Sequence, residues 1–242
     1  MSCAVLISGQ PRFCRDFDLF LANLQPSCDF YFHLWSINNL RDRDKWDDSR
    51  HYISSQWRSI QAEKARDMIQ ARIGHHHLES LEFSDCYQYP LPQIDHANKE
   101  GLVFMWLGWK RVFDDLISRG KTYQYIFKAR PDIGLSGSFD PSSLDTSIGL
   151  HVPNIGWHGH NHKINDLCAV GSIDHISEYL TLIDHVEHYH KNKSCTLHPE
   201  TVLAYHLSIK KISVHKAPIP YTFRSYWKNT NDIDWGTWDQ AQ

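Results

Sequence analysis

The sequence predicts an α/β fold, in a single domain, with a mainly parallel central sheet flanked by helices. Three observations support this prediction. Short apolar runs rich in β-branched and aromatic residues alternate with segments of helical periodicity. The first strand, helix and strand fit within residues 3–35, the size of a right-handed crossover unit. With 242 residues, 41% of them hydrophobic and 13% aromatic, the chain can bury one sizeable core.

The first half of the chain is predicted to alternate between strand and helix. Residues 3–8 are apolar and end at Gly9-Gln10-Pro11, a turn that suits the end of a buried strand. Residues 12–24 place apolar side chains on one helix face, and Pro26 ends that pattern. The next predicted elements are a second strand at 28–35, a solvated loop at 38–49, a helix at 55–73 that stops at Gly74, and an irregular stretch at 74–98.

The clearest helix lies at 101–118, where apolar residues recur on one broad face and Gly120 follows. Residues 123–129 then alternate as a strand does and run into Arg130-Pro131-Asp132. Because proline cannot continue a central ladder, we expect this charged group at a carboxyl end of the sheet, where ligands bind in open α/β folds. The remaining predicted elements are strands at 149–152, 166–170 and 212–215, a polar loop at 156–165, and helices at 173–189 and 199–208.

Composition argues against several classes of protein. The formal charge is −3 and no block of basic residues occurs, so the sequence does not predict a nucleic-acid binder. The longest apolar stretch, at 102–109, is too short to span a bilayer, and no secretory leader is visible. Six cysteines without a Cys-x-x-Cys pair favour reduced thiols. We therefore expect a cytoplasmic protein without a transmembrane segment.

Two polar clusters follow predicted strands in the first part of the chain. In Ser8-Gly9-Gln10-Pro11-Arg12, free backbone N–H groups and Arg12 could receive a nucleotide's phosphate or ribose, or the segment is an ordinary turn with a surface arginine. In Lys128-Ala129-Arg130-Pro131-Asp132, Asp132 could ligate Mg²⁺ or Mn²⁺ and Arg130 could neutralise a diphosphate. The alternative is a structural salt bridge between Arg130 and Asp132.

Two further clusters lie in the second half. Asp166, after Asn165, could hydrogen-bond a hydroxylated acceptor, or it could cap its own turn. His198-Pro199-Glu200 has the pattern of a helix start, with proline near the first position and an acid in the first turn. Glu200 could instead be a general base or an acceptor ligand.

Histidines give a competing hypothesis. His158, His160 and His162 alternate, so a Zn²⁺ site, and with it a metal-dependent hydrolase, is conceivable, although the spacing is weakly specific. Protonation of all 17 histidines would change the formal charge from −3 to +14. Stability is therefore expected to change steeply between about pH 5 and 7.

Taken in order, the motifs resemble a family of glycosyltransferases found in bacteria and large DNA viruses. The segments that carry the resemblance are residues 4–12, the apolar helix at 105–116, residues 123–132, Asn165-Asp166-Leu167-Cys168-Ala169-Val170-Gly171-Ser172, and His198-Pro199-Glu200-Thr201-Val202-Leu203. The resemblance implies a GT-A fold, a Rossmann-like sandwich that binds a nucleotide sugar, usually with a divalent metal held by Asp-x-Asp. Here Arg130-Pro131-Asp132 replaces that motif and offers one carboxylate.

The resemblance also implies roles for individual residues. It assigns donor binding to Ser8, Gly9, Arg12, Arg130 and Asp132, with Asp132 as the metal ligand for Mn²⁺ or Mg²⁺; acceptor binding to Asn165 and His198; and catalysis to Asp166 and Glu200. Residues 1–135 would be the nucleotide-binding half and residues 136–242 the acceptor-side half. The implied partners are a nucleotide-sugar donor and a glycan or other hydroxylated acceptor. The alternatives are the hydrolase above and a non-catalytic sugar- or nucleotide-binding module.

Overall fold

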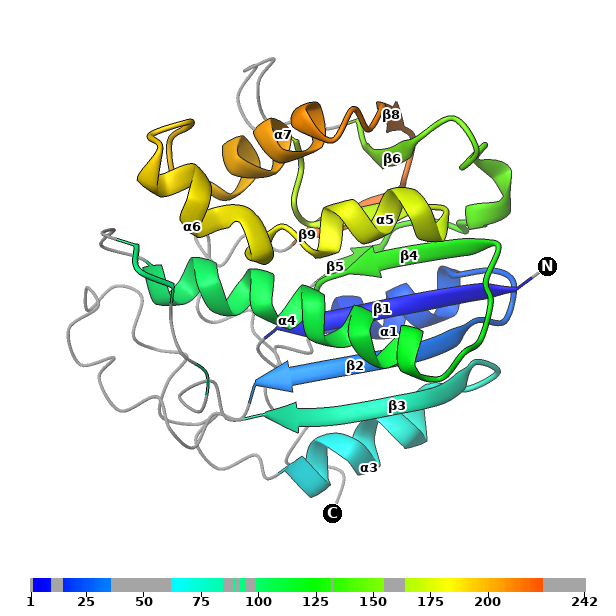
Figure 1. Ribbon diagram of the computed structural model, residues 1–242. Helices are drawn as coiled ribbons and strands as arrows, with labels where there is room; N and C mark the ends of the chain where they lie inside the picture. The colour runs from blue at the N-terminus through cyan, green and yellow to red at the C-terminus, as the bar shows by residue number, and fades with distance from the viewer. Residues whose placement is uncertain are drawn as a thin grey trace.

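A computed structural model describes residues 2–9, 15–35, 62–84, 89, 92–94, 99–131, 133–154 and 164–223. Its central sheet has seven strands: β1 (Cys3–Gly9), β2 (Asp29–Trp35), β3 (His77–Ser84), β4 (Tyr125–Ala129), β6 (Leu150–Pro153), β7 (Cys168–Gly171) and β8 (Val214–Ala217). The spatial order is β3-β2-β1-β4-β7-β6-β8 (Figure 1). A separate two-stranded sheet joins β5 (Ile133–Leu135) to β9 (Tyr221–Phe223) in antiparallel pairing.

Most neighbouring strands of the large sheet run parallel. Strand β1 pairs in parallel with both β2 and β4, and β2 pairs in parallel with β3. Strand β7 is antiparallel to β4 and β6, while β6 and β8 are parallel. The predicted strands at 3–8, 28–35 and 123–129 are therefore adjacent in one sheet, and the predicted fold class is confirmed.

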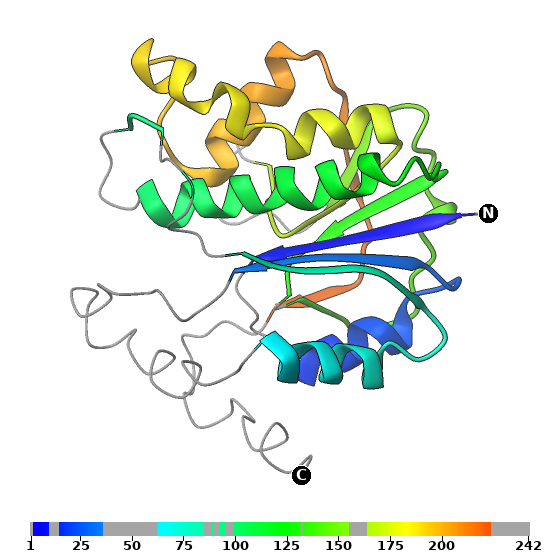
Figure 2. The same cartoon turned by 60° about the horizontal axis from the view of Figure 1, so that its bottom comes forward.

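Helices cover both faces of the sheet (Figure 2). One face is covered by four helices, α4 (Lys99–Ser118), α5 (Ile173–Leu180), α6 (Ile183–Lys191) and α7 (Pro199–Ile209). The other face is covered by α1 (Arg15–Asn23) and α3 (Ala62–Arg72). A 3₁₀ turn, η5, spans Pro141–Ser143. Each face has its own apolar core because strand side chains alternate between the faces. None of the described helices is long and apolar enough to cross a membrane.

Helix α4 packs closely on the start of the chain, as its apolar pattern predicts. Trp106 and Trp109 are fully buried against the sheet. Gly108 brings the helix backbone close to β1, because a Cβ atom there would lie 2.6 Å from Ser8 Oγ. The helix ends before Gly120, whose φ of +64° suits the left-handed position after a helix.

The prediction of an irregular stretch at 74–98 is wrong, because β3 occupies part of it. The register between β2 and β3 shifts after Phe30, which pairs with Leu78, whereas Tyr31 pairs with Ser80. This bulge inserts one extra residue, so apolar Leu78 and Leu81 pack on the same core although they are three positions apart. A search for strict alternation therefore misses the strand.

The predicted helix at 173–189 is two helices, α5 and α6. The Thr181 hydroxyl donates to the Ser177 carbonyl at 2.9 Å, a side-chain bond that competes with continued helix. Leu180 and Leu182 are both fully buried. In one straight helix, residues two positions apart point to different faces, so the break lets both leucines enter the core.

Candidate functional site

Three of the predicted clusters meet at the edge of the sheet where β1 and β4 end. Ala129, the last residue of β4, pairs with Cys168, the first residue of β7. Arg130 and the segment 165–167 are therefore neighbours at this carboxyl edge. Strand β1 reaches the same edge, since a Cβ atom on Gly9 would lie 3.4 Å from Pro131 Cδ. Gly9 also has a φ of +141°, a conformation that favours glycine.

Asn165 organises the turn that precedes β7. Its side-chain oxygen accepts a hydrogen bond from the Leu167 N–H at 2.8 Å, and its side-chain amide donates to Tyr221 Oη at 3.3 Å. Tyr179 Oη donates to the Asn165 carbonyl at 3.5 Å. Both Asn165 and Asp166 are buried. The side chain that caps this turn is therefore that of Asn165, and the role of the Asp166 carboxylate stays a prediction.

Glu200 lies in the first turn of α7, so the predicted helix start is confirmed. Its backbone carbonyl accepts a hydrogen bond from the Ile164 N–H at 3.3 Å, which ties the helix start to the turn before β7. His198 occupies the N-cap position, and its Nδ1 lies 3.9 Å from Glu200 Oε2. The Glu200 side chain is only 14% exposed, compared with 46% for His198. The Glu200 side chain is therefore mostly covered, whereas the His198 side chain is exposed.

The buried phenol of Tyr179 marks the centre of this group. Burial raises the pKa of Tyr179 well above its ordinary value, and the charges of Asp166 and Glu200 raise it further. The Arg130 charge acts in the opposite direction and lowers the pKa of Tyr179. Arg130, Asp166 and Glu200, which come from separate motifs, therefore lie close enough to Tyr179 to influence its pKa.

Lys128 is a member of this group that sequence reasoning noted but did not assign. It is 1% exposed, and its ammonium donates to the carbonyls of Asp166 and Leu167. The ammonium also lies 4.1 Å from the centre of the Trp109 ring and 5.3 Å from that of Tyr179. The signal in the sequence was a lysine inside an otherwise apolar strand.

Tyr221 was also missed. Tyr221 lies in β9, which pairs with β5. Strand β5 begins at Ile133, two positions after Pro131. Burial raises the pKa of Tyr221, the hydrogen bond from Asn165 lowers it, and Glu200 is among the charges that raise it. Tyr221 thus adds an aromatic ring beside the polar residues of the turn.

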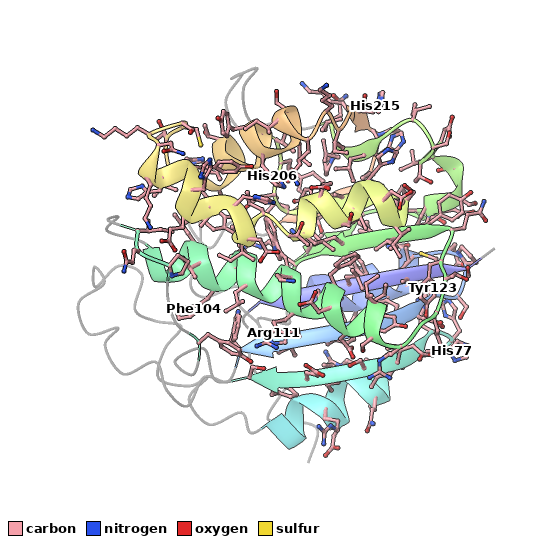
Figure 3. The ribbon with its side chains drawn as sticks, in the orientation of Figure 1. His77, Phe104, Arg111, Tyr123, His206 and His215 are labelled. Carbon is pink, nitrogen blue, oxygen red and sulfur yellow. The ribbon has the colours of Figure 1, made fainter. Side chains whose placement is uncertain are left out.

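A second polar and aromatic cluster lies farther along the same edge, at the ends of β2 and β3. Trp35 Nε1 donates to the Phe104 carbonyl at 3.0 Å, and the Arg111 guanidinium lies 4.4 Å from the centre of the Tyr89 ring. His33 Nε2 is 3.0 Å from Ser84 Oγ. Figure 3 shows Phe104 and Arg111 on the side toward which these strands point, with Tyr123 and His77 at the opposite end of the sheet.

Of the remaining predicted residues, the structure describes Ser8 but not the others. Ser8 is buried, and its hydroxyl lies against Gly108 of α4 and has no hydrogen-bond partner. The residues that lie outside the described ranges are Arg12, Asp132, His158, His160 and His162. Within those ranges, no group of three or more His, Cys, Asp or Glu side chains is placed to hold a metal ion.

The element order and mostly parallel sheet define an α/β protein of Rossmann type, consistent with a GT-A-like fold. One solved structure with this fold is that of the glycosyltransferase GlyE from Streptococcus pneumoniae TIGR4. The two chains are 13% identical, with a TM-score of 0.50, and the match covers 90% of this chain and 46% of the GlyE chain. This chain therefore matches less than half of GlyE. No protein-family model matches the sequence, and no curated protein does either.

Proposed function

We propose that this protein is a glycosyltransferase that moves a sugar from a nucleoside-diphosphate donor to a hydroxylated acceptor such as a glycan. The observation that carries the proposal is that the segments holding Arg130, Asp166 and Glu200 come together at the carboxyl edge of the sheet, through the pairing of Ala129 with Cys168 and the hydrogen bond from the Ile164 N–H to the Glu200 carbonyl. In open α/β sheets this edge is where ligands bind. The fold shared with GlyE supports the same class of activity.

The chemistry of glycosyl transfer needs both kinds of charge. The acceptor oxygen forms a bond to the anomeric carbon, while the bond from that carbon to the diphosphate breaks and its electron pair leaves with the nucleoside diphosphate. A cation such as Arg130 would stabilise the charge that develops on the leaving group. A carboxylate, Asp166 or Glu200, would take the proton from the acceptor hydroxyl.

We assign the two substrates to different sides of Arg130. The donor side comprises Ser8, Gly9, Arg12, Arg130 and Asp132. The structure describes Ser8, Gly9 and Arg130 of this set, and the Gly9 backbone lies beside Pro131. The acceptor side comprises Asn165 and His198 with the two carboxylates, and the ring of Tyr221 would add a surface for a sugar.

A divalent metal remains part of the proposal only through Asp132. A bound Mn²⁺ or Mg²⁺ would neutralise diphosphate charge. The described residues do not form a metal site, and Asp132 lies outside them, so we derive no step through the ion.

The test is a screen of UDP-, GDP-, CMP- and dTDP-sugars for thermal stabilisation, with and without Mn²⁺. A donor at about 100 times its Kd adds ~2.7 kcal/mol of stability. Sugars that stabilise the protein are then assayed for nucleoside diphosphate release in the presence of mono- and oligosaccharides. Stabilisation without turnover would indicate a binding module. Neither stabilisation nor turnover with any donor would refute the proposal, and tightly bound zinc found by elemental analysis would favour the hydrolase.

A further inference from the structure

The backbone just before β7 is held by side chains. Three successive carbonyls, those of Asn165, Asp166 and Leu167, accept hydrogen bonds from side chains of other elements. Tyr179 of α5 donates to the first carbonyl, and Lys128 of β4 donates to the other two. Regular pairing with β4 begins only at Cys168. Lys128 therefore supplies the charged donor for the two residues next to the strand.

A lysine at this position is costly for the sheet. Lys128 and Ile126 are two positions apart on β4 and thus lie on the same face, the one covered by α4 and α5. An apolar side chain could fill this space without the large desolvation penalty of an ammonium ion. The Trp109 ring and the two carbonyls offset part of that penalty. What the ammonium adds, and an apolar residue would not, is a fixed conformation of the turn.

We infer that Lys128 is a positioning residue that fixes the turn at 165–167 and thereby aims the side chains of Asn165 and Asp166. The consequence for catalysis rests on the proposed glycosyltransferase function, but the control of the turn does not. Lys128 acts through the backbone of the turn and not through contact with a substrate. Its loss should therefore lower turnover more than it lowers donor affinity.

The first experiment measures backbone hydrogen exchange in Lys128→Met, Lys128→Arg and the control Lys110→Met. Lys110 forms ion pairs with Asp114 and Asp184 on the helical face, away from the turn. In Lys128→Met, the amides at 165–168 should exchange about 10- to 100-fold faster, as expected for loss of a charge-assisted hydrogen bond. The amides of β1 and β2 should be unchanged, and Lys128→Arg should restore part of the protection.

Two exchange results would overturn the inference. Unchanged exchange at 165–168 would mean that Lys128 does not hold the turn. Equal acceleration throughout the sheet would mean that it serves only global stability. If Lys128→Met does not fold, the wild-type protein labelled with ¹⁵N-lysine provides the measurement. One ammonium signal should exchange slowly with water and show a nuclear Overhauser contact to an indole, and the lack of such a signal would also overturn the inference.

The second experiment links the turn to the proposed reaction. With the donor found by the screen, kcat of Lys128→Met should fall about 100-fold, the typical effect of a displacement near 1 Å. The affinity for UDP or GDP, measured by calorimetry, should stay within about twofold of wild type. Equal losses in affinity and kcat would overturn the positioning role. If the wild-type protein turns over no donor, the proposed function fails, and the exchange data still decide the role of Lys128.

Discussion

The two edges of the central sheet use polar residues in different ways. At the amino edge, Tyr123 Oη donates to Asp29 and bonds to Tyr31 Oη, each at 2.7 Å, and Lys121 bridges Asp29 and Glu79. At the carboxyl edge, charges of both signs gather around the buried Tyr179, and Lys128 is buried with them. The amino edge is a closed network that joins strands. The carboxyl edge concentrates charge at a cost in stability, which is typical of a functional site.

The two edges also differ in how their buried histidines, His76 and His33, are hydrogen-bonded. His76 lies near the amino edge, where its Nδ1 accepts from the Cys28 N–H at 3.1 Å and its Nε2 donates to the Leu21 carbonyl at 3.0 Å. His33 lies toward the carboxyl edge, and only its Nε2 has a partner. Among the described residues, buried polar atoms without partners at this edge also include Ser8 Oγ. Ser8, a residue that we place in the site, thus has a buried hydroxyl without a hydrogen-bond partner.

The largest effect should come from the carboxylates of the carboxyl edge. If Glu200 or Asp166 is the general base, Glu200→Gln or Asp166→Asn should lower turnover by about 10² to 10⁴, since this is the range for lost acid–base catalysis. Loss of a cap alone would cost ~1 to 2 kcal/mol of stability and leave turnover largely intact. Turnover with the donor from the screen and urea unfolding separate these outcomes.

A matched control for the carboxylate variants is Glu187→Gln, because Glu187 pairs with Lys191 on the surface of α6. We expect this variant to behave as wild type in turnover and donor binding. Normal turnover in both Glu200→Gln and Asp166→Asn would remove both carboxylates from the mechanism and weaken the functional contrast between the edges.

The next effect is a pH dependence of stability to which His33 contributes more than His76, although burial lowers the pKa of His76 as well. Burial, and then the Arg111 charge, lowers the pKa of His33 from 6.5 to about 4. Between these values the unfolded chain binds a proton that the folded protein does not, so stability falls as pH falls. The contribution is complete above pH 6.5 and is lost progressively toward pH 4; it amounts to roughly 3 kcal/mol.

Replacement of each histidine tests this difference. His33→Leu should flatten the decline in unfolding free energy between pH 7.5 and 4.5. At pH 7.5 it should cost about 1 kcal/mol, because it removes one hydrogen bond, from Nε2 to Ser84. His76→Leu should destabilise at both pH values, since it leaves the Cys28 N–H and the Leu21 carbonyl unpaired. Urea unfolding is the measurement. An unchanged pH slope in His33→Leu would contradict the prediction.

A somewhat smaller effect is expected from the arginine of the site. Arg130→Ala should weaken binding of the nucleoside diphosphate by roughly 1.5 to 3 kcal/mol, the value of a lost charge-assisted contact. Arg119→Ala is the control, because Arg119 pairs with Asp115 near the end of α4. Calorimetry with UDP or GDP reports the difference. Equal affinity in the two variants would assign Arg130 to structure.

Local sequence patterns predicted the elements whose signals are long and regular. Strands β1, β2 and β4 are mostly apolar, helix α4 has one broad apolar face, and all four were predicted. Strand β3 was missed because its bulge breaks the alternation, and the boundary between α5 and α6 was missed because apolar residues continue through it. Strand β9 was missed because it has only three residues and because its partner β5 is equally short and lies far away in the chain.

The candidate site was only partly predictable for the same reason. The position of Arg130, Asn165 and Glu200 at element ends is visible in the sequence, and the structure brings these residues near Tyr179 or Tyr221. Lys128 and Tyr221 depend on packing between elements that are far apart in the chain. The lysine inside an otherwise apolar strand hints at the burial of Lys128 but does not reveal its partners, and the approach of Tyr221 to Asn165 leaves no local pattern. The roles of Arg12 and Asp132 stay predictions, since both lie outside the described residues.

The smallest effect compares one tyrosine from each edge. Tyr123→Phe removes the hydroxyl that joins Asp29 and Tyr31, so it should cost about 1 kcal/mol of stability, the net value of a typical hydrogen bond, and leave turnover unchanged. Tyr221→Phe removes the acceptor for the Asn165 amide. Because Tyr221 is partly exposed, we expect little loss of stability, but the KM for the acceptor should rise a fewfold, as Asn165 loses a partner that orients it. Urea unfolding and acceptor kinetics on both variants give the comparison. If Tyr123→Phe changes the acceptor KM and Tyr221→Phe changes only stability, the division between a structural edge and a functional edge is wrong.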